Sequence, residues 1–234
     1  MKRALVTGGS GAIGAAICRC LAAQGARVYV HANRRLEEAK CMAAAIGAAA
    51  VAFDVTDRSA TQAALDRILA DGPIQILVNN AGIHDDAVMP GMKESQWRRV
   101  IDVSLNGFFN VTQPLLMPMI GTRWGRIVSI SSVAALIGNR GQVNYAAAKS
   151  GLHGASRSLA IELASRGITV NVVAPGIIAT PMAEQAFAQE AIERLVPMKR
   201  AGTPHEVAEL VGFLASDGAG YISGQVIGVD GAMT

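Results

Sequence analysis

The sequence predicts an α/β fold, in which a doubly wound parallel sheet of about seven strands carries helices on both faces. Short apolar runs alternate with helix-length segments along all 234 residues. The mean hydropathy of +0.32 is high, as expected for strands that are buried on both faces. No proline- or serine-rich linker divides the chain, so we expect residues 1–234 to form one domain.

The candidate strands are short apolar runs bounded by turn-forming residues. They are Arg3–Thr7, Arg27–His31, Ala49–Phe53, Gln75–Asn79, Arg126–Ile130, Thr169–Val173 and Gln225–Val229. Helix-length segments separate the first four of them, at Ile13–Gln24, Arg35–Ile46 and Asp57–Ala70. This order is typical of parallel sheets, because parallel neighbours need a long crossover connection. A helix-like segment, Pro181–Arg200, follows a Pro-Gly turn, where it can close over a ligand at the sheet edge.

The composition excludes several classes of function. The net charge is only +3 and no basic stripe is present, which argues against nucleic-acid binding. No apolar run reaches the roughly 18 residues that a membrane span needs. The three cysteines, Cys18, Cys20 and Cys41, lack metal-ligand spacing. We therefore expect no metal site, and reduced thiols in a cytoplasmic protein.

A glycine-rich turn follows the first predicted strand and leads directly into a helix pattern. Glycines permit a sharp turn and a close approach of the backbone to a ligand. The amide groups at a helix N-terminus can then bind a pyrophosphate. The residues expected to bind a dinucleotide here are Gly8, Ser10, Gly11, Ile13 and Gly14. The alternative is a glycine-rich loop without a ligand.

The end of the second strand indicates which dinucleotide is bound. An NAD enzyme carries an acidic residue there for the ribose 2′-hydroxyl, whereas this chain has Ala32, Asn33 and Arg34. Arginine and asparagine can bind a 2′-phosphate, which a carboxylate would repel. We therefore expect NADP(H), with Asn33 and Arg34 as contacts. Arg35 can equally belong to the solvated start of the next helix, and ordinary surface charge is the alternative for both arginines.

Two further strand ends carry candidate cofactor contacts. Asp54 and Val55 follow the third strand, where an acid can accept a hydrogen bond from the adenine amino group. The alternative for Asp54 is helix capping, for which Asp57 is better placed. Asn80 and Gly82 follow the fourth strand, where small residues leave room for the ribose and amides can bridge neighbouring strand ends. The alternative there is a plain turn.

Candidate catalytic residues lie on the fifth strand and the next helix. Tyr145 and Lys149 are spaced i, i+4 and therefore share one face of a helix. A nearby ammonium group lowers the pKa of a tyrosine, which can then exchange a proton with a carbonyl or an alcohol. Such a pair alone is most often a surface pair. Ser132, however, follows the fifth strand at the sheet edge where ligands bind, and it can hydrogen-bond a substrate oxygen beside Tyr145.

These motifs together resemble the pattern of the short-chain dehydrogenase/reductase family, in order and in spacing. The resembling positions are Thr7, Gly8, Ala12 and Gly14, then Asn79–Gly82, Ser132, Tyr145, Lys149, Asn171, Pro175 and Gly176. The resemblance covers the whole chain and implies a single Rossmann domain with Ser132, Tyr145 and Lys149 as catalytic residues. It also implies that Lys149 bonds the nicotinamide ribose. The residues that it assigns to the nicotinamide end are Pro175, Gly176, Ile178 and Thr180.

One departure from the family pattern concerns the proton relay. The family usually has asparagine where this chain has Ser104, and that asparagine supports a water between the lysine and solvent. A serine hydroxyl can also hold a water, with a different geometry. Asn106, two residues on, is expected to face another way. We retain Ser104 as a candidate catalytic residue.

Within the family, the chain resembles bacterial 3-oxoacyl-acyl-carrier-protein reductases. The resembling stretches are Gly125–Val128, Gly138–Tyr145 and Ser165–Asn171, and Met117–Gly121 and Pro197–Arg200 look like the versions of aryl polyene and related polyketide-type pathways. The resemblance implies an acyl carrier protein as partner. It also implies carrier contacts at Arg123 and Arg166, which we expect near the mouth of the active site, and a homotetramer paired through the last strand. The alternative for the arginines is ordinary exposed charge at strand and helix ends, and for the last strand it is an internal edge strand.

Two other functions stay open at this point. One is a dehydrogenase of a free small alcohol, such as a sugar alcohol or a steroid, although the acid-free second strand argues against NAD-linked oxidation. The other is a catalytically silent protein that binds a dinucleotide, which the altered residue Ser104 keeps open.

Overall fold

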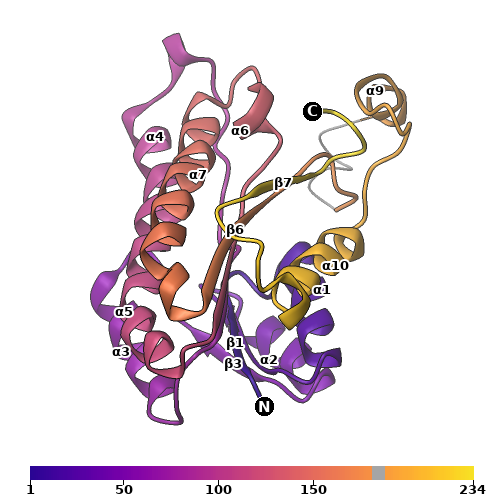
Figure 1. Cartoon of the computed structure of the whole chain (residues 1–234). Helices are drawn as coiled ribbons and strands as arrows, with labels where there is room; N and C mark the ends of the chain where they lie inside the picture. Colours follow the sequence, from indigo (N-terminus) through magenta and orange to yellow (C-terminus); the bar gives the residue numbers. More distant parts are fainter. Residues whose placement is uncertain (181–187) are drawn as a thin grey trace.

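Seven parallel strands form one sheet in the order β3-β2-β1-β4-β5-β6-β7 (Figure 1). The computed structural model describes residues 1–180 and 188–234. The strands are β1 (Arg3–Val6), β2 (Arg27–Ala32), β3 (Ala49–Ala52), β4 (Ile76–Asn79), β5 (Gly125–Ile130), β6 (Ile168–Pro175) and β7 (Val226–Val229). The predicted α/β fold with a doubly wound parallel sheet is confirmed.

Helices connect the strands and cover the sheet. They are α1 (Ala12–Ala23), α2 (Leu36–Ala45), α3 (Arg58–Leu69), α4 (Glu94–Ile101), α5 (Gly107–Thr122), α6 (Ala134–Ile137), α7 (Val143–Leu163), α9 (Gln189–Leu195) and α10 (Pro204–Leu214). The short helical turns are η1 (Met89–Gly91), η2 (Asp102–Asn106), η3 (Ala164–Arg166) and η4 (Asp217–Ala219). The expected helix in Pro181–Arg200 is present as α9, whereas residues 181–187 lie outside the described residues.

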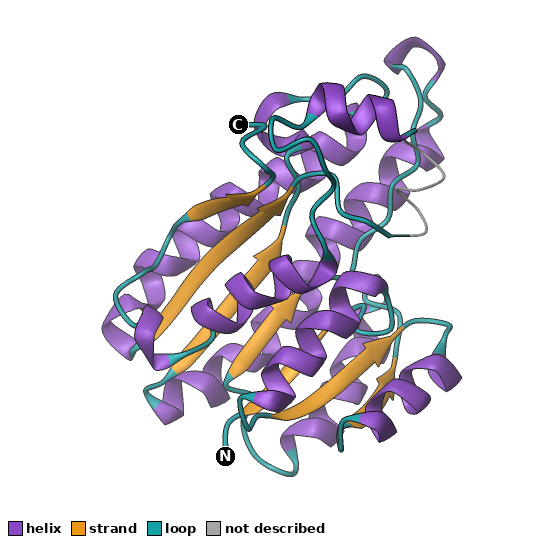
Figure 2. Ribbon diagram, turned by 90° about the vertical axis from the view of Figure 1, so that its right-hand side faces the viewer, coloured by secondary structure: helices purple, strands orange, loops and turns teal. Residues whose placement is uncertain are grey.

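Two apolar layers hold the helices on opposite faces of the sheet (Figures 1 and 2). Successive strand residues point to opposite faces, so Ala4 and Val6 pack in one layer and Leu5 in the other. The first layer contains α1, α2 and α10, and the second contains α3, α5 and α7. Because the strands are covered on both sides, their sequences are mostly apolar, which explains the high mean hydropathy.

The first turns of the helices fix the loops at the carboxyl edge of the sheet. Asp57 caps α3 by accepting a hydrogen bond from the Ala60 amide at 2.9 Å, as expected from the sequence.

The order of the strands reverses at β1, which has β2 on one side and β4 on the other. Ligands of open α/β sheets bind at such a reversal, beyond the carboxyl ends of the strands.

Candidate active site

The glycine turn joins β1 to α1 at the carboxyl edge of the sheet. Gly8 has a φ of +63°, a conformation that residues with a side chain rarely adopt. The N-cap of α1 is Gly11, which offers no side-chain cap, and the first turn of the helix carries no acidic residue. The amide groups at this helix N-terminus, including that of Ile13, are therefore available to an anion such as a pyrophosphate.

Gly14 sets the distance between α1 and this turn. A Cβ atom at Gly14 would overlap the carbonyl oxygen of Gly8 and would approach Nδ2 of Asn80 to 2.8 Å. A larger residue can fit only if the turn moves. The glycine required by the sequence pattern is thus explained by close packing of the helix on the turn.

The end of β4 braces the same turn through side-chain hydrogen bonds. Asn80 Nδ2 donates to the carbonyl oxygens of Thr7 at 2.9 Å and Gly8 at 3.1 Å. The hydroxyl oxygen of Thr7 in turn accepts from the amides of Asn80 and Ala81, both at 2.9 Å. The expectation that amides here bridge neighbouring strand ends is confirmed.

A buried histidine on β2 holds the turn from the other side, a role that the sequence did not reveal. His31 Nδ1 accepts from the Gly8 amide at 3.0 Å, and its Nε2 lies 2.9 Å from the Phe53 carbonyl oxygen. Since Nδ1 accepts, Nε2 carries the proton and donates to Phe53. Burial lowers the pKa of His31 to about 4, despite the opposing effects of the Phe53 carbonyl and Asp54. His31 is therefore neutral near pH 7.

The candidate cofactor-selecting residues lie together beyond β2 and β3. Burial alone would raise the pKa of Asp54, but hydrogen bonds from Thr56, a hydrogen bond from Asn33 and the charge of Arg34 together lower it. Asn33 and Arg34 are exposed. Arg35 instead forms an ion pair with Glu38 at 3.2 Å at the start of α2. The interpretation of Arg35 as a helix-start residue is thus the better one, while Val55 is buried beside this group.

Ser132, Tyr145 and Lys149 come together at the carboxyl end of β5. The side chains of Ser132 and Tyr145 share a hydrogen bond. Lys149 Nζ donates to the carbonyl oxygen of Ile130 at 2.8 Å and lies 5.7 Å from the ring centre of Tyr145. A serine, a phenol and an ammonium group at one strand end can orient a carbonyl oxygen and protonate it.

The electrostatics of this group differ from the expectation. Burial raises the pKa of Tyr145, the hydrogen bond with Ser132 opposes this, and the negative charge of Asp86 raises the pKa further. The sequence predicted a pKa lowered by Lys149, which was wrong for this state of the site. The physical reason is the depth of the phenol, together with a lysine that donates to Ile130 rather than to the phenol. Burial also lowers the pKa of Lys149 to about 8.

Gly82 is explained by the lysine rather than by a turn. A Cβ atom at Gly82 would lie 3.0 Å from Lys149 Nζ, which is closer than side chains normally pack. The glycine therefore leaves room for the ammonium group. On the other side, Ser131 Oγ contacts the Lys149 carbonyl oxygen at 3.2 Å and His153 Nε2 at 2.7 Å, which fixes this part of α7 on β5.

Ser104 lies in η2, a π-helical turn, and is buried. Its hydroxyl has no hydrogen-bond partner among the described residues. It borders a cavity of about 10 Å³, which is room for about one water molecule. The residues that line this cavity do not include Tyr145 or Lys149. Asn106 donates to Asp102 at 2.7 Å on the surface and faces away, as expected.

The candidate nicotinamide contacts follow β6 at the same edge of the sheet. Pro175 ends the strand, and the Gly176 amide donates to the carbonyl oxygen of Val229 at 2.9 Å. A Cβ atom at Gly176 would lie 2.8 Å from the Cα atom of Asp230. Ile178 is buried, and Thr180 ends the described stretch. The structure thus brings these residues to the edge that carries Tyr145.

Arg123 and Arg166 lie elsewhere, at the amino ends of β5 and β6. Arg123 donates to the Ser165 carbonyl oxygen at 3.4 Å, so the two arginines belong to one region. They are separated from Tyr145 by the length of α7, whose 21 residues span roughly 30 Å. The expectation that both arginines lie near the mouth of the active site of their own chain was wrong, because α7 runs back from that edge to the opposite one.

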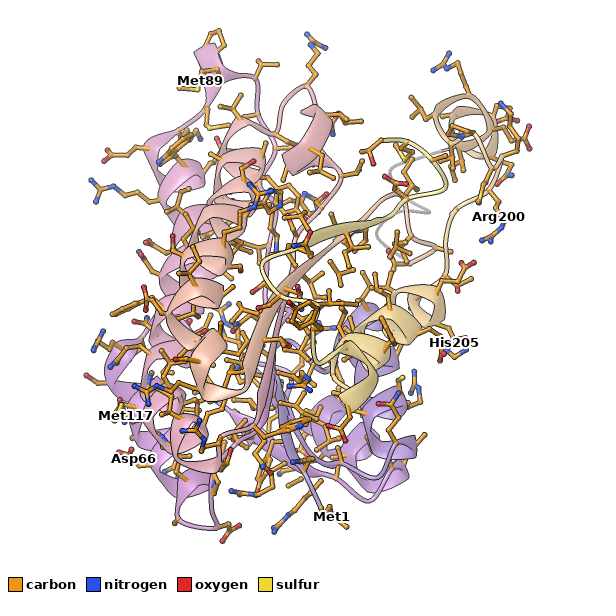
Figure 3. The ribbon with its side chains drawn as sticks, in the orientation of Figure 1. Met1, Asp66, Met89, Met117, Arg200 and His205 are labelled. Atoms are coloured by element: carbon orange, nitrogen blue, oxygen red, sulfur yellow. The ribbon has the colours of Figure 1, made fainter. Side chains whose placement is uncertain are left out.

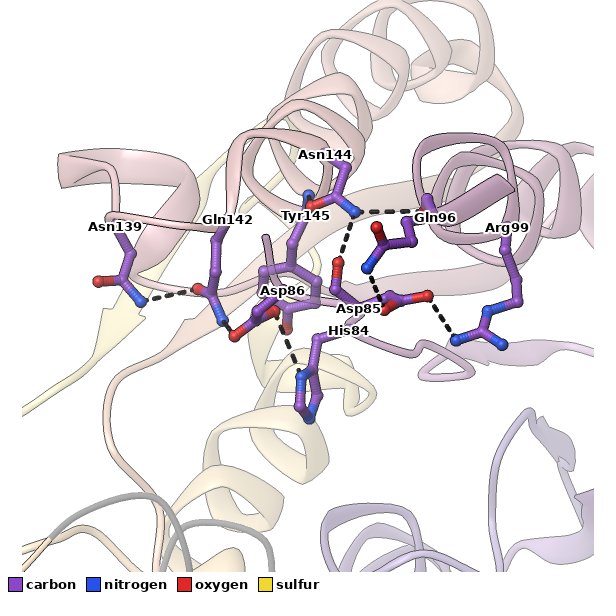
Figure 4. Close-up of polar contacts among 9 residues, drawn as sticks. All are labelled: His84, Asp85, Asp86, Gln96, Arg99, Asn139, Gln142, Asn144 and Tyr145. Carbon is purple, nitrogen blue, oxygen red and sulfur yellow. Dashed lines mark hydrogen bonds and ion pairs between the residues drawn. The ribbon is translucent and has the colours of Figure 1, made fainter. Parts of the chain in front are cut away.

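A polar network that the sequence did not reveal borders Tyr145 (Figure 4). It joins His84, Asp85 and Asp86, which follow β4, to Gln142 and Asn144 at the start of α7. No local sequence motif predicts this network, because its members are brought together only when the segment after β4 packs against α7.

The described residues contain no cluster of histidine, cysteine or acidic residues that could hold a metal ion. None of their helices is long and apolar enough to cross a membrane.

Comparisons with known proteins agree with this geometry. A family model described as enoyl-(acyl carrier protein) reductase matches residues 8–234. The 3-oxoacyl-acyl-carrier-protein reductase FabG of Aggregatibacter actinomycetemcomitans is 44% identical over 239 residues, which cover 98% of each chain. The protein of the same name from Escherichia coli strain K12 is 44% identical over 237 residues, 99% of this chain and 97% of the relative. Nodulation protein G of Azospirillum brasilense is 42% identical over 240 residues, 99% of this chain and 98% of the relative.

Proposed function

The chain belongs to the short-chain dehydrogenase/reductase family, and we propose that it uses NADPH to reduce a 3-oxoacyl thioester, carried on an acyl carrier protein, to the 3-hydroxyacyl thioester. The main support is the hydrogen-bonded pair of Ser132 and Tyr145, with Lys149 beside it, at the carboxyl edge next to the open N-terminus of α1. The substrate class is supported by the relatives, which are named 3-oxoacyl-acyl-carrier-protein reductases. In this proposal residues 1–234 act as one dinucleotide-binding domain.

The residues have distinct roles in the proposed reduction. NADPH, when bound, supplies the hydride that reaches the carbonyl carbon at C3. Tyr145 donates its proton to the carbonyl oxygen, and Ser132 hydrogen-bonds that oxygen where negative charge develops. An ammonium group has three donors, and Lys149 uses one of them on Ile130. The others are available to the nicotinamide ribose.

The cofactor preference rests on the residues beyond β2. Asn33 and Arg34 offer hydrogen-bond donors to a 2′-phosphate. The described residues at the end of β2 include no acidic side chain that could accept a hydrogen bond from a 2′-hydroxyl. Asp54 already interacts with both residues, so a phosphate must compete with this carboxylate. The pyrophosphate would lie on the glycine turn and the first turn of α1.

The carrier and the assembly are linked in this proposal. Arg123 and Arg166 lie roughly 30 Å from Tyr145, the length of the 21-residue α7. A carrier bound there therefore serves the active site of another copy of the chain. Apolar side chains on the outer faces of α5 and α7 support assembly: Phe109, Met117 and Ile161 are 50%, 74% and 82% exposed, and Figure 3 places Met117 on this outer side. We propose a homotetramer, in which β7, an edge strand of the sheet, also pairs subunits.

The state of the cysteines supports a cellular compartment for this protein. Cys18, Cys20 and Cys41 are all free, which agrees with a reducing compartment and a cytoplasmic enzyme.

The proposed function is tested with Tyr145→Phe, which removes the proton donor and keeps the ring. NADPH and NADH oxidation is measured with carrier-bound and carrier-free 3-oxoacyl thioesters and with free ketones. We expect a fall in turnover of roughly 10²–10⁴, nearly unchanged NADPH affinity, and the highest kcat/KM with NADPH and a 3-oxoacyl thioester. Tyr221→Phe is the matched control, because Tyr221 is fully exposed. A wild-type protein that binds NADPH but reduces no 3-oxoacyl thioester would refute the proposal.

A further inference from the structure

The segment after β4 is fastened to the start of α7, directly beside Tyr145 (Figure 4). Asn144 Nδ2 donates to the Asp85 carbonyl oxygen at 2.9 Å, and the Ala87 amide donates to the Gly141 carbonyl oxygen at 2.9 Å. Gln142 Nε2 donates to Asp86 Oδ2, also at 2.9 Å. The position of Asp86 relative to the catalytic helix is therefore fixed by hydrogen bonds on both sides of it.

The two neighbouring carboxylates of this segment have different partners. Asp85 forms an ion pair with Arg99 at 2.6 Å and accepts from Gln96 Nε2 at 2.8 Å. Asp86 has no ion pair with an arginine or lysine in the described part of the chain. Its charged partner is His84, whose Nδ1 lies 3.3 Å from Asp86 Oδ1, and both side chains are about four-tenths exposed. Asp85 is thus paired with a guanidinium group, whereas the partner of Asp86 is an imidazole.

The charge of Asp86 acts on Tyr145. It raises the pKa of the phenol, in addition to the larger effect of burial and against the hydrogen bond with Ser132. Two further ionisable groups belong to this part of the site: Lys149 on the same helix, 5.7 Å from the ring centre, and His84, which faces Asp86. A carboxylate at this place disfavours the tyrosinate, because like charges repel.

We propose that Asp86 is a positioning residue that keeps Tyr145 protonated, the form in which the phenol acts as an acid. This favours reduction, because the reverse oxidation needs the tyrosinate as a base. The inference rests on the proposed function only in the assignment of Tyr145 as the acid.

The test is a direct titration of Tyr145 that needs no substrate. The chain has three tyrosines, so all can be replaced by 3,5-difluorotyrosine, whose more acidic phenol titrates where the fold persists. The ¹⁹F resonance of Tyr145 is assigned by its loss in Tyr145→Phe. In Asp86→Asn we expect the titration midpoint of Tyr145 to fall by on the order of half to one pH unit. The asparagine is isosteric, and its amide oxygen can still accept from Gln142.

Asp85→Asn is the matched control, because it removes a negative charge at the neighbouring residue, where that charge is paired with Arg99. It should leave the midpoint of Tyr145 unchanged, and Asp86→Glu should retain most of the wild-type value. In the unlabelled enzyme, the alkaline limit of kcat for reduction should move down in Asp86→Asn by the same interval. The rate of 3-hydroxyacyl thioester oxidation at neutral pH should rise.

Two results would overturn the inference. One is a midpoint in Asp86→Asn equal to that of the wild-type protein. The other is an equal fall in Asp85→Asn and Asp86→Asn, which would mean that the segment matters only for structure. Failure of the wild-type enzyme to reduce any 3-oxoacyl thioester would refute the proposed function but would leave the titration result intact, so the two failures are distinguishable.

Discussion

The buried His31 makes the stability of this protein dependent on pH below neutrality. Its side chain is 1% exposed, and it joins the Gly8 amide to the Phe53 carbonyl oxygen. Burial lowers its pKa from 6.5 to about 4. Between these values the unfolded chain binds a proton at His31 and the folded chain does not. The free energy of unfolding should therefore decrease as the pH falls through this window.

The size of this effect follows from the shift in pKa. A lowering from 6.5 to about 4 corresponds to about 3 kcal/mol at most, and most of it is lost by about pH 4.5. The comparison is His31→Asn, in which the amide oxygen can take the place of Nδ1 and accept from Gly8. This variant does not titrate, so its stability should depend less steeply on pH. It also loses the bond to Phe53, which lowers its stability at neutral pH.

The measurement is urea unfolding of both proteins, followed by circular dichroism between about pH 7 and about pH 4.5. The difference in the free energy of unfolding between wild type and His31→Asn should shrink by about 2–3 kcal/mol over this range. Parallel pH curves for the two proteins would refute the reasoning, since they would mean that His31 has the same pKa folded and unfolded.

Two further predictions concern the cofactor and the relay. Arg34→Ser should raise the Kd for NADPH by roughly 10–100-fold and leave NADH binding unchanged. The control Arg35→Ser removes only the ion pair with Glu38 and should change the affinity for neither cofactor. Equal losses of NADPH and NADH affinity in Arg34→Ser would contradict the assignment of Arg34 to the 2′-phosphate. Ser104→Asn adds volume next to a cavity of about 10 Å³ and should preserve or raise turnover, measured at saturating NADPH; a large loss would indicate that this chain depends on a relay built around the serine.

The sheet could be predicted because each strand is a local apolar run, and the bounds of β1 through β5 were placed to within one residue. The larger difference is at β6, which continues to Pro175. Proline has no amide hydrogen, so it normally ends a strand pattern. Its carbonyl oxygen still accepts from the Val133 amide at 2.8 Å, which extends the strand beyond the predicted end.

The candidate site was predictable where its residues form a local motif or follow a strand end at the carboxyl edge, as Ser132 and Asn80 do. The glycine turn and the spacing of Tyr145 and Lys149 are local signals. The roles of His31 and Asp86 depend on contacts with Gly8 and with the start of α7, which exist only in the folded sheet. The position of Arg166 was misjudged for the same reason, since adjacency to a catalytic helix in sequence says nothing about which end of that helix carries the site.

The bracing of the glycine turn has a consequence for the order of folding. Gly8 is joined to His31 across 23 residues of sequence, and Thr7 to Asn80 across 73. The turn can therefore reach its final form only after β2 and β4 have joined β1, and such distant contacts form late because loop closure comes first. A dinucleotide then finds no binding surface in the early, partly folded chain. The dinucleotide stabilises the native state by mass action. This stabilisation appears mainly as slower unfolding, while the folding rate stays nearly independent of the dinucleotide concentration.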